Sequence, residues 1–228
     1  MVSKKTTLVE ELFVAQAHLG HKTNRVHPKS TKYIYTIENG VSIIDLAQTE
    51  QLLENAIEYV KLLAKEGKTL LIVATKKIAA GRIEELAKAN NIAYITTKWP
   101  AGLLTNFESI KHNIKKLNDM KKGKLEGEWN KLVKHEQSRL NRELSKLERH
   151  YGGLVNITKI PDAMLVVDLK KEKNSVKEAI MMNVPLIGIV DTNVDPKGIN
   201  YPIPANDDSL SSVEFIVAKL IDAYATKK

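Results

Sequence analysis

The sequence predicts an α/β protein with a parallel sheet and helices on both of its faces. Runs such as 69–74 and 184–190 are apolar at successive positions, as in strands that are buried on both sides. Helical segments alternate with these runs, which is typical of parallel α/β folds. Between 105 and 151 the alternation is interrupted by apolar residues at heptad spacing. We expect an α/β domain, residues 1–104 and 152–228, with an inserted antiparallel helical hairpin, residues 105–151.

The N-terminal part begins with a helix. Thr7 and Glu10 have the spacing of a capping box at its start. The dipeptide Asn39-Gly40 predicts a tight hairpin turn, because both residues tolerate positive φ. The elements expected here are a helix from Thr7 to before Gly20, a polar basic loop over 18–29, and strands over 33–37 and 41–44.

The α/β body follows as alternating segments. The boundaries of the helices come from the helical spacing of apolar residues, and those of the strands come from continuous apolar runs. The expected helices cover about 49–65, 78–89, 175–182 and 209–225, and the expected strands 69–74, 92–97, 163–167 and 184–190.

The interrupting segment reads as two helical arms of a coiled coil. Thr105 and Glu108 form a capping-box pattern at its start, and a break is expected over 122–127. Glycines at 152 and 153 suit the end of the second arm. At 1.5 Å per residue, the arms should project about 25–30 Å. The apolar positions are Leu103, Phe107, Ile110, Ile114 and Leu117 in the first arm, and Val133, Leu140, Leu144, Leu147 and Tyr151 in the second.

The chain is basic, with 35 Lys and Arg against 27 Asp and Glu, a net charge of +8 and a pI near 9.4. Residues 108–149 contain 12 Lys or Arg and 7 Asp or Glu, so the hairpin alone carries 12 − 7 = +5. Such a balance favours a polyanionic partner such as nucleic acid. The alternative is that these charges only solvate a coiled-coil surface.

The sequence contains no pattern that predicts catalysis. There are no cysteines, no glycine-rich dinucleotide or phosphate loop, and no serine in a nucleophile-elbow setting. Lys76 and Lys77 follow a buried strand and suit a phosphate at a helix N-terminus. His18 and His21, together with strand-end aspartates, offer a metal site as a minor alternative; these aspartates are Asp168, Asp191 and Asp195. We expect turn and cap roles for them instead, and capping by Asn206-Asp207-Asp208, so no catalytic residue, cofactor or metal is predicted.

Trp99 stands beside Lys98 at a strand end, just before the hairpin. Stacking on a base is one interpretation. A tryptophan wedged between hairpin and body is the interpretation that we favour.

The N-terminus does not resemble a secretory leader, since two lysines precede a helix that contains Glu10, Glu11 and Gln16. No apolar stretch approaches the ~20 residues that span a bilayer. We therefore expect a cytoplasmic protein without membrane contact.

The chain resembles the bacterial ribosomal protein family two of the small subunit. The resemblance is carried by motifs in family order: Ala17-His18-Leu19-Gly20-His21, His27-Pro28-Lys29, Asn39-Gly40, Thr75-Lys76-Lys77, Leu104-Thr105-Asn106-Phe107, Gly152-Gly153, Pro161-Asp162-Ala163, Asp191-Thr192-Asn193, Asp195-Pro196 and Asn206-Asp207-Asp208. Trp99-Pro100-Ala101-Gly102 departs from the family's W-L-G-G, which puts the angle of the hairpin in doubt.

The resemblance implies a Rossmann-like (flavodoxin-like) sheet and no catalysis, against the alternative of an enzyme acting on a nucleotide or sugar phosphate. It implies contacts to small-subunit rRNA and to other small-subunit proteins, including the large one that captures mRNA, with no homo-oligomer in the working state. The residues that it places at the RNA are His18, His21, Lys22, Arg25, His27, Lys29, Lys76, Lys77, Lys98, Lys111, Lys115 and Lys116.

Overall fold

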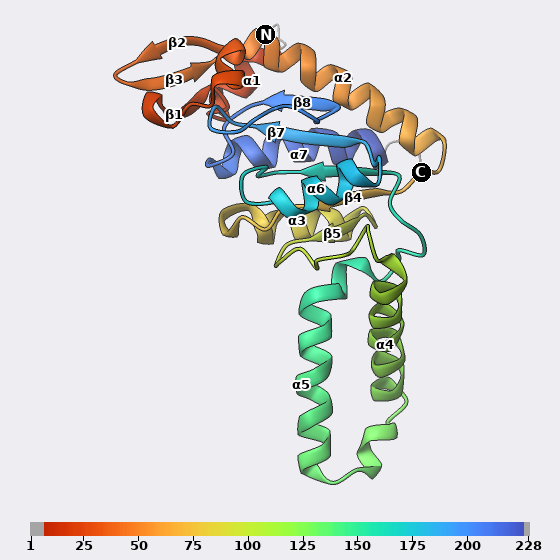
Figure 1. Cartoon of the computed structure of the whole chain (residues 1–228). Helices are drawn as coiled ribbons and strands as arrows, with labels where there is room; N and C mark the ends of the chain where they lie inside the picture. Colours follow the sequence, from red (N-terminus) through yellow and green to blue (C-terminus); the bar gives the residue numbers. More distant parts are fainter. Residues whose placement is uncertain (1–6, 226–228) are drawn as a thin grey trace, which may run out of the picture.

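A computed structural model describes residues 7–225 and shows a five-stranded parallel sheet (Figure 1). The strands are β4 (Leu70–Val73), β5 (Ala93–Ile95), β6 (Ala163–Val166), β7 (Leu186–Val190) and β8 (Tyr201–Pro204). Their spatial order is β5-β4-β6-β7-β8, which is the 2-1-3-4-5 order of flavodoxin-like folds. The predicted fold class is confirmed. The ends of the expected α/β domain, and the first part of the segment considered as a leader, lie outside the described residues.

Both faces of this sheet are covered. The side chains of β4 alternate, so that Leu70 and Ile72 enter one apolar core while Leu71 and Val73 enter the other. This explains why the strand reads as a continuous apolar run. Helices α2 (Leu46–Lys65), α3 (Lys77–Ala89) and α7 (Leu210–Ala225) contribute to the first core, and α6 (Lys173–Met181) with the base of the hairpin contributes to the second.

The edge strand β8 is absent from the sequence-based prediction. It contains Pro202 and Pro204, which have no backbone N–H and argue against a strand in the middle of a sheet. At the edge they are tolerated, because only one side of β8 pairs, with β7. Ala205 N donates a hydrogen bond to Val190 O at 3.2 Å. The backbone N–H groups of the odd-numbered residues therefore point to β7, and positions 202 and 204, which have no N–H, point away from it.

A separate three-stranded antiparallel sheet lies at the N-terminal end of the chain (Figure 1). It consists of β1 (Leu19–Lys22), β2 (Ile34–Glu38) and β3 (Val41–Ile44). The predicted hairpin turn is confirmed, since Asn39 and Gly40 have φ values of 49° and 76°. The predicted loop over 18–29 is wrong in part, because it contains β1 and the 3-10 turns Thr23–Arg25 and Pro28–Tyr33 begin within it. The residues of β1, of which only Leu19 is a large apolar residue, become a strand here through pairing with β3.

The first helices begin at capping residues. The capping box of Thr7 and Glu10 is confirmed at the start of α1 (Leu8–Val14). Helix α2 begins at Leu46 rather than near 49, because the side chain of Asp45 accepts a hydrogen bond from Ala47 N at 3.0 Å.

Helices α4 (Phe107–Leu125) and α5 (Lys134–Tyr151) extend side by side away from the sheet (Figure 1). With 19 residues, α4 is about 28 Å long. Lys121 Nζ lies 2.8 Å from Glu148 Oε1 across the pair. The status of residues 105–151 as an inserted domain stays a prediction.

Two local details of the hairpin prediction are wrong in part or in full. The break expected over 122–127 is confirmed in its second half only, because α4 continues to Leu125 and the chain then turns at Gly127, whose φ is 74°. No capping box forms between Thr105 and Glu108, because the N-cap is Asn106 and its side chain makes no capping bond. Thr105 instead lies near Glu178 of α6.

Among the helices that the structure describes, none has both the length and the apolar character that a bilayer span requires.

Candidate nucleic-acid interface

Lys76 lies at the centre of an ion-pair cluster beyond the carboxyl ends of the parallel strands. Its Nζ is 2.7 Å from Asp207 Oδ1 and 2.6 Å from Asp208 Oδ1, and Asp168 Oδ2 is 3.7 Å away. Burial lowers the pKa of Lys76, but the hydrogen bonds to Asp207 and Asp208 outweigh burial and raise the pKa overall. Lys76 is therefore protonated, and its charge is used within the chain.

The carboxyl group of Asp207 titrates near neutral pH. Burial, followed by the charge of Asp191, raises its pKa to about 7, and the hydrogen bond from Lys76 opposes this only in part. The backbone N–H of Asp207 also donates to Asp191 Oδ2 at 3.4 Å. Burial and the negative charge of Asp191 together favour the protonated form of Asp207 in the folded protein.

The turn before α7 divides its roles among three residues. Asn206 Oδ1 accepts hydrogen bonds from Asp208 N at 2.8 Å and from Ser209 N at 3.2 Å, which forms an Asx turn just before α7 begins at Leu210. Asp207 and Asp208 instead direct their carboxylates to Lys76. These three residues therefore build the turn before α7, and the prediction that they cap the helix is wrong, because Ser209 O accepts the first helical bond, from Val213 N.

His21 joins the same cluster from β1. Its Nδ1 is 3.1 Å from Asp191 Oδ1 and its Nε2 is 3.4 Å from Asp208 Oδ2. The hydrogen bond to Asp191 raises the pKa of His21, and burial opposes this. Gly20 makes the approach possible, since a Cβ there would lie 2.9 Å from Ser42 O. The N-terminal sheet is thus fastened to the carboxyl ends of the parallel strands.

Side chains that can ligate a metal do come together here, but not the set considered from sequence. His21, Asp191 and Asp208 each offer an atom within 4.8 Å of the others. His18 lies elsewhere and stacks on Phe13 with ring centroids 4.4 Å apart, and burial lowers its pKa. Lys76 already supplies positive charge to Asp168, Asp207 and Asp208, and His21 Nε2 also lies 2.8 Å from Asn193 Nδ2, so we assign no metal to these side chains.

The crevice between β4 and β6, where flavodoxin-like folds hold their ligands, is closed by the chain itself. Thr75 Oγ1 donates a hydrogen bond to the buried Glu172, and Lys171 Nζ donates to Thr75 O at 2.7 Å. Burial raises the pKa of Glu172. These contacts join the segments that follow β4 and β6, at the end of the sheet where folds of this strand order bind ligands.

The basic loop residues divide into paired and unpaired ones. Lys29 Nζ lies 2.6 Å from Asp195 Oδ2, and His27 Nδ1 accepts a hydrogen bond from Lys29 N at 3.3 Å. Lys22 and Arg25 are exposed and have no ion pair with any residue between 7 and 225.

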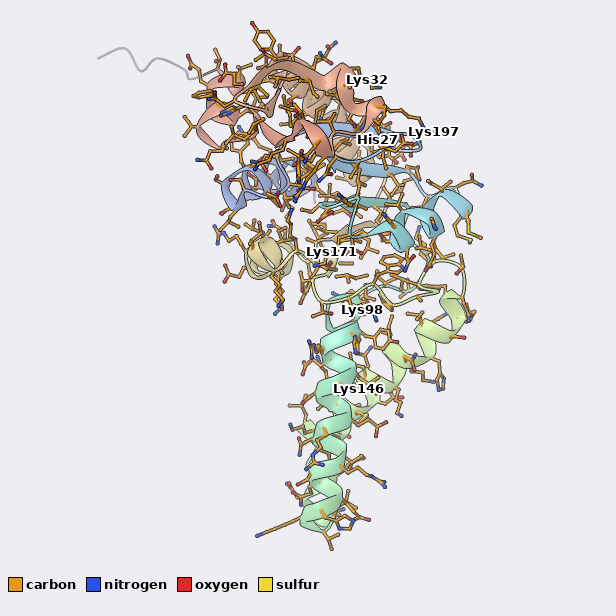
Figure 2. The ribbon with its side chains drawn as sticks, turned by 60° about the vertical axis from the view of Figure 1, so that its left-hand side comes forward. His27, Lys32, Lys98, Lys146, Lys171 and Lys197 are labelled. Atoms are coloured by element: carbon orange, nitrogen blue, oxygen red, sulfur yellow. The ribbon has the colours of Figure 1, made fainter. Side chains whose placement is uncertain are left out.

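The other predicted contact residues lie along α3, the strand end before Trp99, and α4. Lys77, Lys98, Lys111 and Lys115 are exposed, and none has an ion pair within the part of the chain that the structure describes. Lys116 is also exposed but pairs with Glu143 of α5. Figure 2 shows Lys98 at the junction of hairpin and body.

Three further lysines surround a hollow that sequence reasoning did not single out. They are Lys170, Lys173 and Lys177, which line a cavity of about 360 Å³ together with His27 and Asn193. The density of lysine between 170 and 177 was the available signal.

Trp99 adopts the structural role that we favoured. It is 7% exposed and packs with Phe107 and Ile110 at the base of the hairpin. Glu178 of α6, which sequence reasoning missed, accepts hydrogen bonds from Trp99 Nε1 and Gly102 N, both at 2.9 Å. The positive φ of this turn, 86°, falls on Gly102. The departure from the W-L-G-G pattern therefore leaves the glycine that the turn needs.

Internal hydrogen bonds hold the strand-end crevice, and exposed lysines and arginines without ion pairs among residues 7–225 lie on the same chain. This arrangement is typical of a structural α/β protein with a polyanionic partner. Residues 12–226 match the family model of ribosomal protein S2, and the chain belongs to that family. It is accordingly a non-enzymatic, structural component of the small ribosomal subunit, associated with the rRNA and proteins of that subunit. The alternative of a nucleotide or sugar-phosphate enzyme has no support.

Similar proteins cover most of the chain. The small ribosomal subunit protein uS2 of Dictyoglomus thermophilum is 46% identical over 97% of this chain and 90% of that protein. The proteins of the same name from Picosynechococcus sp. and Nostoc punctiforme are 43% and 42% identical, each over 93% of this chain and over 83% and 81% of their own lengths.

Proposed function

We propose that this chain binds small-subunit rRNA through exposed basic side chains on the N-terminal sheet, the strand ends and the hairpin. The observation that carries the proposal is that Lys22, Arg25, Lys77 and Lys98 are exposed and have no ion pair with residues 7–225. Unpaired surface cations gain most from phosphate, because no internal partner has to be given up and counterions are released from the RNA.

His21 and Lys76 have a different role in this proposal. Both are held by carboxylates, and Lys76 would give up its contacts to Asp168, Asp207 and Asp208 if it turned to RNA. We propose that they position the N-terminal sheet against the body, so that Lys22 and Arg25 are presented at a fixed place. Contacts between such basic side chains and RNA phosphates fix the orientation of the protein on the RNA. Recognition then depends on the shape of the RNA more than on its base sequence.

We further propose that the chain acts as a single copy in the cytoplasm and contacts neighbouring small-subunit proteins, among them the large one that captures mRNA. Exposed apolar side chains support protein contacts, since Tyr35 and Ile37 of β2 and Val14 of α1 lie at the surface. Protein neighbours are a natural partner for such side chains.

Sedimentation tests this proposal directly. The tagged full-length chain, expressed at a low level, should move with the small subunit in a sucrose gradient. Crosslinking within those subunits should join the chain to rRNA near Lys22 and Lys98 and to proteins near Tyr35. A chain that stayed at the top of the gradient while subunits moved down would contradict the proposed function.

A further inference from the structure

We propose that the outer face of α5 is the surface by which the hairpin binds helical rRNA. This surface, the α5 row, consists of His135, Arg139, Arg142, Lys146 and Arg149. The inference rests on the proposed function and goes further, because the sequence placed the hairpin contacts on α4, at Lys111, Lys115 and Lys116.

The α5 row is a straight line of positive side chains along one side of the helix. Its members follow one another in steps of four, three, four and three residues. At about 100° per residue, these steps keep them on the side opposite Leu144, the buried residue that faces the hairpin interior. All five are exposed. The row extends over 14 residue steps, from 135 to 149, or about 21 Å along the helix.

The acidic residues of α5 lie off this row. Glu143 pairs with Lys116 of α4, and Glu148 pairs with Lys121 of α4 at 2.8 Å. The hairpin thus uses its own acids to join its two arms. Between residues 7 and 225 no carboxylate forms an ion pair with any member of the α5 row.

Helix α4 offers a weaker surface to a polyanion. Its side opposite the buried Ile114 carries Glu108 and Asp119 as well as Lys116, so both signs of charge are present. Lys116 is engaged by Glu143, while Lys111 and Lys115 lie on the flank of the helix. An RNA helix laid along α4 would meet Glu108 and Asp119 on the outer side of that helix, whereas the acids of α5 lie at the flanks of the α5 row.

The α5 row continues into the body of the protein. Thr97 Oγ1 donates a hydrogen bond to Arg149 O at 2.9 Å, which places Lys98 beside the last member of the row. In Figure 2, Lys146 lies on α5 and Lys98 at the junction with the body. A single RNA element that lies along the hairpin and reaches the strand end at Lys98 would therefore contact basic side chains over this whole length.

The chemistry of the row fits a duplex better than a single-stranded loop. Three of its five members are arginines, whose planar guanidinium groups bind phosphate with two parallel hydrogen bonds. The row contains no tyrosine, phenylalanine or tryptophan on which an unstacked base would lie. A rigid helix with regular charges matches the regular phosphates of helical RNA.

Two triple variants of the full chain test this inference. One changes Arg139, Arg142 and Lys146 to Gln, and the matched control changes Lys111, Lys115 and Lys116 to Gln, so that each hairpin has three fewer positive charges. Binding to purified small-subunit rRNA is measured across a salt series, with circular dichroism and thermal unfolding to confirm folding. The substituted side chains of α5 face solvent, so both variants should fold.

We expect the α5 variant to bind at least tenfold more weakly, and its log–log salt slope to fall by about 2–2.7, or roughly 0.7–0.9 for each phosphate that the variant no longer neutralises. The α4 control should change less on both measures. Equal weakening in the two variants, or a larger effect in the control, would overturn the inference while leaving rRNA binding intact. If the wild-type chain showed no salt-dependent binding, the proposed function would fall as well.

Discussion

Trp99 Nε1 donates a hydrogen bond to Glu178 Oε1 at 2.9 Å, and this contact ties the turn before the hairpin to α6. The other carboxylate oxygen accepts from Leu104 N at 3.0 Å. Burial alone would raise the pKa of Glu178, but these hydrogen bonds, with that of Gly102, outweigh it and lower the pKa. One half-buried carboxylate therefore accepts hydrogen bonds from several donors of the same turn.

Replacing Glu178 with Ala should loosen the base of the hairpin. The N–H groups of Trp99, Gly102 and Leu104 would be deprived of an ionised acceptor, and we expect the free energy of unfolding to fall by roughly 3 kcal/mol. Urea denaturation measures this. Glu178→Gln keeps one acceptor oxygen and should be less destabilising.

The carboxylate of Glu178 should also make the stability of the fold depend on pH in the acidic range. Because the folded-state pKa lies below the usual 4.5, its stabilisation is present above that pH and is lost as pH falls through the lowered value. A Glu178→Ala variant as stable as wild type at pH 7 would show that this residue does not fasten the hairpin.

Gly153→Ala should destabilise the junction of α5 and β5. A Cβ at 153 would overlap the carbonyl oxygen of Tyr94, which is backbone and cannot rotate away. Overpacking of this kind costs about 1–3 kcal/mol. Gly152→Ala is the matched control, because its Cβ would meet only Glu148 Cγ at 3.5 Å and its φ is −57°. Thermal unfolding of the two variants should separate them, and equal melting temperatures would contradict the packing argument.

Asp207 should make stability depend on pH in the neutral range. Its folded-state pKa of about 7 lies above the ordinary 3.8, so the folded protein binds the extra proton and stability falls as pH rises towards and through 7. Between pH 6 and 8 the contribution should change by on the order of 1 kcal/mol.

Removing this carboxyl group isolates the effect. The free energy of unfolding is measured by urea denaturation at pH 6 and pH 8, for the wild type and for Asp207→Asn. The stability of the wild type relative to the variant should be lower at pH 8 than at pH 6. Asp195→Asn serves as the control, because Lys29 lowers the pKa of Asp195 and the group does not titrate in this range. A pH-independent difference for Asp207→Asn would mean that its proton is not gained on folding.

Replacing Lys22 and Arg25 with Gln should weaken rRNA binding and flatten its salt dependence. With two fewer phosphates neutralised, the log–log slope should fall by up to about 1.4–1.8. Lys61 and Lys65 of α2, changed to Gln, remove the same amount of charge from another exposed surface. Equal effects of the two pairs would point to net charge rather than to a contact at the N-terminal sheet.

Local signals in the sequence predicted most of the fold. Apolar runs located four of the five parallel strands, and the cap at Thr7 and the turn at Asn39-Gly40 follow from chemistry within a few residues. Strand β8 was not predicted because its prolines argue against a strand. Strand β1 was not predicted because its pairing with β3 cannot be inferred from its four residues.

The candidate site was less accessible to the same reasoning. His21 and Asp191 are 170 positions apart in the chain, and Lys76 and Asp207 are 131 apart. A sequence shows that each is charged, but not that they meet. Whether a surface lysine is paired depends on the same distant contacts, which is why Lys116 and Lys22 look alike in sequence and differ in the structure.

The prolines of β8 have a consequence for the chain before it reaches RNA. A free strand edge can recruit the edge of a second molecule and start aggregation. At 202 and 204 the outward N–H groups do not exist, and Pro204 O is occupied by Thr49 Oγ1 at 2.6 Å. At these positions the sheet of a newly synthesised copy therefore cannot pair with the sheet of another copy. This protects the chain from edge-to-edge aggregation between its synthesis and its assembly into the subunit.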